Sequence, residues 1–254
     1  MVKSCNTLSL ILRTRSIGEA DRLVTLFTWE KGKIAAVARG ARKTRSKLAS
    51  GVDLFTYAFM SLYRGKSLYT VTQVQVKHRF VTFHGDPLRY AYATYLAELV
   101  ERFLPEEEPF PEIGDLLWGG WDFLDKGGDP ELLCRFFELK ILLLGGYAPH
   151  LRECSRCLQT APIAHFSVAD GGVLCAACGK NYQNALKISP GTASLGGYLM
   201  MCSYEVLFRV KASSGQLKEL KKLNLSLMSH YLEIHDCQSL KYLKKWEKNG
   251  GGIN

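Results

Sequence analysis

The sequence contains two Cys-x-x-Cys pairs, Cys154-Ser155-Arg156-Cys157 and Cys175-Ala176-Ala177-Cys178, which are separated by 17 residues. Four cysteine thiolates at this spacing can surround one Zn²⁺ ion as a tetrahedron, the closed geometry of structural zinc sites. Asp170-Gly171 lies between two short apolar runs in the spacer, and this dipeptide favours the positive φ angles of a hairpin turn. The stretch therefore predicts a zinc ribbon, with Cys154, Cys157, Cys175 and Cys178 as ligands of a structural zinc ion.

Two other interpretations of these cysteines stay open at this point: two disulfides, or a redox-active Cys-x-x-Cys pair. Redox chemistry does not need a doubled motif, which favours zinc. Four cysteines already complete the coordination shell, so we expect His150 and His165 to be ordinary surface or hairpin residues. The other cysteines are expected to be reduced, buried apolar side chains: Cys5, Cys134, Cys202 and Cys237.

A chain of 254 residues is long enough for two domains, each with its own core. We place a nucleic-acid-binding domain at residues 1–80 and a helical domain at 81–254, with the zinc ribbon inserted at 150–182. The N-terminus has no apolar run of signal-peptide length, and no stretch reaches the roughly 20 apolar residues of a membrane span. We therefore expect a cytoplasmic protein.

Positive charge is concentrated at the N-terminal end of the chain. Residues 1–80 carry 15 Lys and Arg against 4 Asp and Glu, whereas residues 81–149 carry 5 against 13 and residues 150–254 carry 13 against 7. A basic excess gathered in one segment is typical of a module that binds polyanions. The alternative is a basic surface that serves only solubility.

The N-terminal segment reads as a small β-barrel. Residues 4–80 alternate between apolar and polar positions, as half-buried strands do. Runs rich in β-branched and aromatic residues predict five strands, at 7–14, 22–28, 32–38, 53–63 and 69–76. Five strands within 80 residues favour a closed barrel, because closure removes exposed strand edges.

A basic loop at residues 39–47 interrupts this strand pattern. It contains five cations and no carboxylate: Arg39, Arg42, Lys43, Arg45 and Lys47. We expect it to be solvated and available to phosphates, because its charge is not compensated locally. Barrels of the oligonucleotide-binding (OB) type also stack bases on aromatic side chains. The aromatic residues of this segment are Phe55, Tyr57, Phe59, Tyr63 and Tyr69, and alternation sends about half of them into the core, so none is singled out.

From residue 84 onwards the apolar spacing becomes helical. The cap-and-proline pairs Asp86-Pro87 and Asp129-Pro130 predict two helix starts, with a further helix at about 112–126 between them. The helix after Pro130 is apolar on most sides and should be the central buried helix. The acidic run 106–108 reads as a solvated connection. Ser189-Pro190 opens another helical region, and apolar residues continue with helical spacing from 217 to 234.

The C-terminal helices have a basic exposed side, formed by Lys211, Lys218, Lys221, Lys222, Lys241, Lys244, Lys245 and Lys248. This side could bind nucleic acid or an acidic protein tail, and a plain solvated surface is an equal alternative. The tail at 250–252 is expected to be disordered. No Ser/His/Asp constellation stands out, so we expect no enzymatic activity.

The chain resembles the RecO family of bacterial recombination mediators over nearly all of its length. The resemblance is carried by the order and spacing of several segments: 18–28, 39–43 with Ser46, 92–99, the two cysteine pairs, 230–232, and 239–241 with Leu243. It implies an α+β architecture: an N-terminal five-stranded OB-fold barrel followed by an all-helical domain with a four-cysteine zinc ribbon. Some relatives lack the cysteines, so zinc would not be required for the shared activity.

The resemblance also implies a function. The family binds single- and double-stranded DNA, anneals complementary strands and helps load RecA onto DNA coated with single-stranded-DNA-binding protein. Implied partners are RecR, RecF in some cases, and the acidic C-terminal tail of the coating protein. The DNA-contacting barrel surface of the family corresponds to Lys33, Arg39, Arg42, Lys43, Arg45 and Lys47. Arg13 and Arg22 are added to this set, although either can pair with Glu19 or Asp21.

Two other functional classes share part of this pattern. An RNA- or ribosome-associated barrel with a zinc ribbon would have the same charge distribution. A thiol oxidoreductase would need reactive cysteines without metal. Affinity for RNA against DNA oligomers separates the first class from the DNA-binding hypothesis, and zinc content with thiol titration separates the second.

Overall fold

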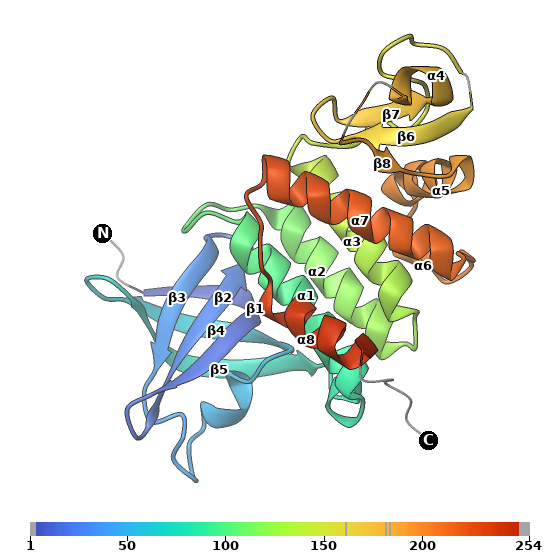
Figure 1. Cartoon of the computed structure of the whole chain (residues 1–254). Coiled ribbons are helices and arrows are strands. Elements are labelled where there is room, and N and C mark those ends of the chain that lie inside the picture. The colour runs from blue at the N-terminus through green and yellow to red at the C-terminus, as the bar shows by residue number, and fades with distance from the viewer. Residues whose placement is uncertain (1–3, 161, 181, 183, 249–254) are drawn as a thin grey trace. The chain divides into compact units, whose positions relative to one another are not determined.

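The computed structural model describes residues 4–160, 162–180, 182 and 184–248 (Figure 1). Its internal contacts form two compact units, one of Met1–Lys126 with Cys237–Asn254 and the other of Gly127–Asp236. Within the described residues, no helix is both long enough and apolar enough to cross a membrane. The tail at 250–252 lies outside the described residues.

The first unit begins with five strands: β1 (Ser4–Ile17), β2 (Asp21–Thr28), β3 (Gly32–Ala38), β4 (Thr56–Arg64) and β5 (Tyr69–Arg79). They close into a barrel in the order β1-β2-β3-β5-β4 (Figure 1). All neighbouring pairs are antiparallel except β3 and β5, which pair in parallel at Val37 and Thr70. Alternate residues such as Val24, Leu26, Ile34 and Met60 fill the interior. The five predicted strands are thus present; β1 and β5 are longer than predicted, and β4 begins at Thr56, three residues later than predicted.

The acidic run 106–108 is exposed, as expected of a solvated connection, but its backbone is also bound to β3. The backbone N–H of Glu107 donates to the carbonyl of Lys33 at 2.9 Å, and a Cβ on Gly32 would lie 1.8 Å from the carbonyl oxygen of Glu108. Gly32 also has a φ of +65°. Glycine is therefore required there for both its conformation and its small size. The run lies against β3, a contact between segments far apart in the sequence.

Three helices belong to this first unit: α1 (Pro87–Phe103), α2 (Pro111–Asp125) and α8 (Gln238–Lys248). Asp86 caps α1 as predicted, because its carboxylate accepts from the backbone N–H groups of Leu88 and Arg89 at 2.9 and 3.1 Å. A Cβ on Gly114 of α2 would lie 2.1 Å from the Phe27 ring, so glycine permits the close approach of α2 to the barrel. Packing thus groups these helices with the barrel, whereas the expected domain boundary lies at residue 80.

A short 3₁₀ segment, η2 (Thr82–Gly85), connects β5 to α1, and another, η1 (Ala49–Gly51), follows the basic loop. Phe55, just before β4, has a left-handed φ of 60° and is 1% exposed. Its ring contacts Phe83, Tyr90 and Trp121 at centroid distances of 5.0–5.4 Å. This aromatic contact compensates for a backbone conformation that is unfavourable for a bulky side chain.

The helices of the second unit are α3 (Pro130–Leu144), α5 (Pro190–Met201), α6 (Tyr204–Leu207) and α7 (Ser214–Tyr231). Helix α3 is its buried centre, as predicted, and packs against α5 and α7. Helix α7 ends at Tyr231, so Ile234 lies outside the helix that its spacing predicted; Glu233 has a left-handed φ of 54° there. The remaining elements form the cysteine-containing subdomain: β6 (Ile163–Ser167), β7 (Gly172–Cys175), α4 (Ala176–Gly179) and β8 (Leu186–Lys187).

Candidate nucleic-acid interface and metal centre

The basic loop is anchored at its base and exposed beyond it. It leaves β3 after Ala38, and the backbone N–H of Gly40 donates to the Asp21 carboxylate at 2.7 Å. The backbone N–H of Arg42 donates to the Ala20 carbonyl at 2.9 Å, and Ala41 is buried. These contacts hold the start of the loop against the β1–β2 turn.

The five predicted loop cations are all exposed: Arg39, Arg42, Lys43, Arg45 and Lys47. Arg42 also donates from its guanidinium to the carbonyl of Gly18 at 2.9 Å, which orients it without neutralising it. In the part of the chain that the structure describes, no ion pair is formed by the other four. The loop therefore presents a cluster of uncompensated positive charge to solvent.

Three other predicted residues already have partners within the first unit. The Lys33 ammonium donates to the Glu101 carbonyl at 2.8 Å and lies 3.3 Å from the Glu106 carboxylate, with 13% of its side chain exposed. Arg22 binds the Asp53 carboxylate, and Arg13 lies 3.4 Å from Glu101. The carboxylate partners of Arg13 and Arg22 are thus distant in sequence, whereas Glu19 and Asp21 were the expected ones.

The aromatic residues of the barrel segment divide as alternation predicts. Tyr69 lies in the barrel core, and Phe55 is buried against α1 and α2. Tyr57 is half-buried, 4.7 Å from the Trp118 ring. Phe59 and Tyr63 share the outer face of β4 and are 37% and 44% exposed. Of the five residues, these two therefore offer the most open ring surface.

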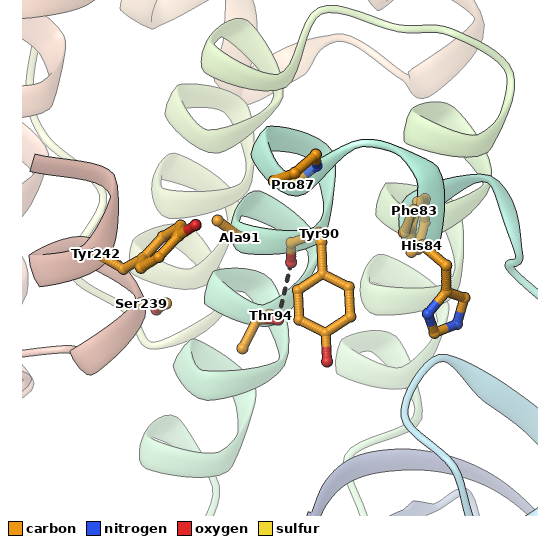
Figure 2. Close-up of a pocket in the computed structure, with 8 residues that line it drawn as sticks. All are labelled: Phe83, His84, Pro87, Tyr90, Ala91, Thr94, Ser239 and Tyr242. Carbon is orange, nitrogen blue, oxygen red and sulfur yellow. Dashed lines mark hydrogen bonds between the residues drawn. The ribbon is translucent and has the colours of Figure 1, made fainter. Parts of the chain in front are cut away.

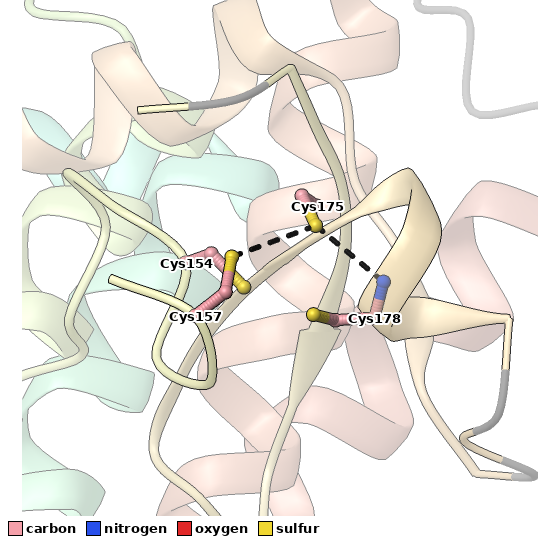
Figure 3. Close-up of side chains that lie close together, drawn as sticks. All are labelled: Cys154, Cys157, Cys175 and Cys178. Atoms are coloured by element: carbon pink, nitrogen blue, oxygen red, sulfur yellow. Dashed lines mark hydrogen bonds between the residues drawn. The ribbon is translucent and has the colours of Figure 1, made fainter. Parts of the chain in front are cut away.

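The four predicted metal ligands come together in the second unit (Figure 3). Cys154 and Cys157 lie on the turn before β6, Cys175 ends β7, and Cys178 lies on α4. Their sulfur atoms are all within 4.8 Å of one another, and the Sγ atoms of Cys157 and Cys175 are 4.0 Å apart. A tetrahedron with Zn–S bonds of about 2.3 Å has sulfur atoms about 3.8 Å apart. The cluster therefore has the size that a zinc ion requires, with little rearrangement.

The protonation of the thiols also fits a bound cation. Burial opposes ionisation of Cys154, but the backbone N–H groups of Cys157 and Cys175 favour its thiolate and bring its pKa down to about 6. The pKa of Cys178 is raised to about 12, first by its hydrogen bond with the Cys175 sulfur and then by burial. Hydrogen bonds with the sulfurs of Cys154 and Cys157 raise it further. Without a cation, these thiols cannot all be thiolates at neutral pH. A divalent metal would supply the charge that four thiolates need.

Two glycines that the sequence analysis did not single out shape the metal centre. A Cβ on Gly172 would lie 1.9 Å from the Ser155 hydroxyl, and a Cβ on Gly179 would lie 2.2 Å from Nδ1 of His165. Each glycine lets one cysteine-bearing turn approach the β6–β7 hairpin. His165 thus packs against α4, while His150 is exposed beside Glu153 at 3.7 Å. Neither histidine belongs to the sulfur cluster.

The predicted hairpin between the cysteine pairs is present. Strands β6 and β7 pair from Ile163 and Cys175 to Ser167 and Gly172. Gly171 has a φ of +64°, as its turn position requires, and its N–H donates to the Val168 carbonyl at 3.2 Å. Asp170 does not have a positive φ, so the connection is a longer turn than a two-residue Asp-Gly hairpin.

Comparison with known proteins gives one consistent result. Residues 1–80 match the protein family described as "Recombination protein O N terminal". Residues 84–241 match the family described as "Recombination protein O C terminal". A protein from Alkaliphilus metalliredigens is 34% identical over 241 residues, which cover 94% of this chain and 98% of the relative. A protein from Dehalococcoides mccartyi is 36% identical over 217 residues, which cover 85% of this chain and 85% of the relative. A protein from Halalkalibacterium halodurans is 30% identical over 241 residues, which cover 95% of this chain and 94% of the relative. All three relatives are named DNA repair protein RecO.

Proposed function

Because the chain belongs to the recombination protein O family of DNA repair proteins, we propose that it is a DNA-binding recombination mediator. In this proposal it binds and anneals single-stranded DNA and assists the loading of RecA onto DNA coated with single-stranded-DNA-binding protein. We propose further that the barrel is an OB fold and that the protein binds DNA without catalysing a reaction. It would act in the cytoplasm, on the nucleoid. The proposed functional boundary lies near residue 80, between the two family matches.

The exposed basic loop carries this proposal. Its five cations lie next to one another on a loop with an anchored base, so phosphates can meet them without prior unfolding. Each phosphate that is neutralised releases counterions, which makes the affinity strongly dependent on salt. We leave Lys33 and Arg22 out of the primary contact surface, because carboxylates already bind both. Arg13, with 60% of its side chain exposed, remains a secondary candidate.

Annealing follows from the same surface. A basic loop that binds two strands through their phosphates lowers the repulsion between them. Phosphate contacts carry no sequence information, and they leave the base edges free to pair. Stacking of bases on the exposed rings of Phe59 and Tyr63 would hold a strand open before pairing.

The metal centre has a structural role in this proposal. Zinc bound by Cys154, Cys157, Cys175 and Cys178 would join the two turns and α4 into one folded subdomain. Closed coordination by four sulfurs leaves no position for a reactive water. The metal would therefore stabilise the second unit without taking part in DNA chemistry.

The partners that we propose follow from family membership: RecR, RecF in some reactions, and the acidic C-terminal tail of single-stranded-DNA-binding protein. The charge of the second unit is compatible with an acidic tail, because Lys211, Lys218 and Lys222 are exposed on it. The same charge would also suit nucleic acid, and only binding experiments with purified partners separate these uses.

The test is to replace Arg39, Arg42, Lys43, Arg45 and Lys47 together by alanine. Affinity for single-stranded oligonucleotides should fall, and the slope of log K against log salt should flatten by about 0.7 for each phosphate that is no longer neutralised, or about 3.5 for five phosphates. Annealing of strands coated with single-stranded-DNA-binding protein should decline in parallel. Matched DNA and RNA oligomers distinguish the RNA-binding alternative. Unchanged affinity and salt slope in a folded variant would refute the assignment.

A further inference from the structure

A cleft of about 460 Å³ lies in the first unit, on the face of α1 between η2 and α8 (Figure 2). Its size is within the range of small-ligand pockets. Aromatic or imidazole rings border it at both ends, with Phe83 and His84 on one side and Tyr242 on the other. Between them α1 presents Tyr90 and the small side chain of Ala91 (Figure 2). No residue of the basic loop lines this cleft.

Two hydroxyl groups that line the cleft already donate their protons to other groups of the protein. The Thr94 hydroxyl donates its proton to the Tyr90 carbonyl at 2.8 Å, and the Ser239 hydroxyl donates to the Glu98 carboxylate at 2.6 Å. Each hydroxyl oxygen can still accept a hydrogen bond from a ligand. No carboxylate is present among the described residues that line the cleft. A flat aromatic ligand with N–H donors, such as a nucleobase, matches these properties.

The surroundings of the cleft are also compatible with the negative charge of a nucleotide. The nearby carboxylates already have partners: Asp86 caps α1, Glu98 binds the first N–H groups of α8, and Asp53 binds Arg22. Helix α8 presents two exposed lysines, Lys241 and Lys245, on either side of Tyr242 in the sequence. A phosphate next to a base in the cleft would therefore lie near a helix that carries exposed positive charge.

A short series of contacts connects the cleft to the basic loop. Arg39, the first loop cation, follows Ala38, which pairs with Arg22 across β2 and β3. The Arg22 guanidinium binds Asp53, and two residues later the Phe55 ring contacts the Tyr90 ring at 5.1 Å. One bound strand could thus contact the loop with its phosphates and the cleft with a base.

We propose that this cleft holds one unstacked base of the single strand whose phosphates the basic loop binds. This inference rests on the proposed function and assigns it a second subsite. The loop supplies affinity that depends on salt, whereas stacking against Tyr242 and Tyr90 supplies affinity that depends little on salt. Every base has an aromatic face, so the subsite does not select a sequence.

The test compares Tyr242→Ala with Tyr198→Ala, because the two tyrosines are 49% and 51% exposed and Tyr198 lies in the second unit. With oligothymidylate as the probe, Tyr242→Ala should weaken binding about fivefold or more, the lower range for one stacked base, and leave the salt slope unchanged. Tyr198→Ala should bind like the unaltered protein. Tyr242→Phe keeps the ring and should retain the affinity, which separates stacking from a disturbance of α8 packing.

A second measurement uses the unaltered protein and does not depend on how any variant folds. Irradiation of its complex with oligothymidylate that carries one 5-iodouracil should cross-link the base to Tyr242, Tyr90 or His84, as identified by mass spectrometry. If the oligonucleotide binds but Tyr242→Ala has no effect and no cross-link maps to the cleft, the base subsite is wrong and the cleft serves a protein side chain or another ligand. If the oligonucleotide does not bind at all, the proposed function itself fails, and the subsite fails with it.

Discussion

Replacing Glu138 by glutamine should destabilise the second unit, because it removes the carboxylate of a buried ion pair. Glu138 and Arg135 lie one turn apart on α3, 2.8 Å from each other, with 0% and 2% of their side chains exposed. The Asn224 amide of α7 donates to the Glu138 carboxylate at 3.0 Å and to the Arg135 carbonyl at 3.2 Å. This network joins α3 to α7 at the centre of the unit.

The expected magnitude follows from burial. Removing one partner of a buried ion pair typically destabilises a protein by about 3–5 kcal/mol. Glutamine keeps one acceptor for Arg135, so we expect the lower value, about 3 kcal/mol. Because about 1.4 kcal/mol corresponds to a factor of ten, amides of α3 and α7 that exchange by unfolding of the unit should exchange more than about 100-fold faster.

The chain offers a convenient way to observe the two units separately. All four tryptophans, at 29, 118, 121 and 246, fall in the first unit. Tryptophan fluorescence therefore follows the barrel unit, while hydrogen exchange by mass spectrometry follows α3 and α7. As a control, Asp122→Asn breaks the Asp122–Lys126 pair of α2, whose side chains are 38% and 63% exposed, and should cost only a few tenths of a kcal/mol.

The double variant Arg135→Met with Glu138→Leu shows whether the loss of stability in Glu138→Gln comes from an unpaired buried charge or from altered packing. Removing both charges leaves no buried ion to compensate, so most of the stability should return. Asn224 keeps the backbone carbonyl of residue 135 as one acceptor. Unchanged α3 exchange in Glu138→Gln, or a double variant as unstable as the single one, would refute the reasoning.

Three further predictions follow from the metal centre and from α8. Cys175→Ser should lower the zinc content measured by atomic absorption and loosen the β6–β7 hairpin. The unfolding transition of the first unit, followed by tryptophan fluorescence, should keep its midpoint. Full zinc content in this variant would contradict the four-sulfur site. Gly179→Ala should weaken zinc retention against a chelator, because its Cβ would overlap the His165 ring, and equal chelation rates would count against that steric argument. Glu98→Gln should destabilise the docking of α8 by about 1 kcal/mol at neutral pH, as measured by exchange of the α8 amides.

The Glu98 effect should also depend on pH in a defined direction. Burial alone would raise the pKa of Glu98, but hydrogen bonds from Ser239, Gln238 and Arg102 outweigh it and lower the pKa. A carboxyl with a lowered folded-state pKa contributes its stability fully above its unfolded-state pKa and loses it as the pH falls through the folded-state value. The difference between Glu98→Gln and the unaltered protein should therefore be present at pH 7 and disappear in acid. A difference that persists or grows in acid would contradict this cause.

Local sequence was sufficient to predict most of the elements and the clustering of the four cysteines. Alternation predicted five strands, and the caps Asp86 and Asp129 predicted the starts of α1 and α3. The four cysteines were predictable because two short turns and one hairpin bring them together. The exposed cations of the basic loop were also predictable, since no carboxylate lies within that loop.

The sequence by itself therefore determined the barrel strands, the helix starts, the cysteine cluster and the charge of the loop, because these depend on residues close together in the chain. Only the tertiary structure decided which cations are compensated: Asp53 binds Arg22 from 31 residues away, and Glu106 binds Lys33. Only the tertiary structure placed α8 on Glu98, 141 residues before Ser239, and so formed the cleft beside Tyr242. Such partners depend on how distant segments pack, and local spacing carries no information about that packing.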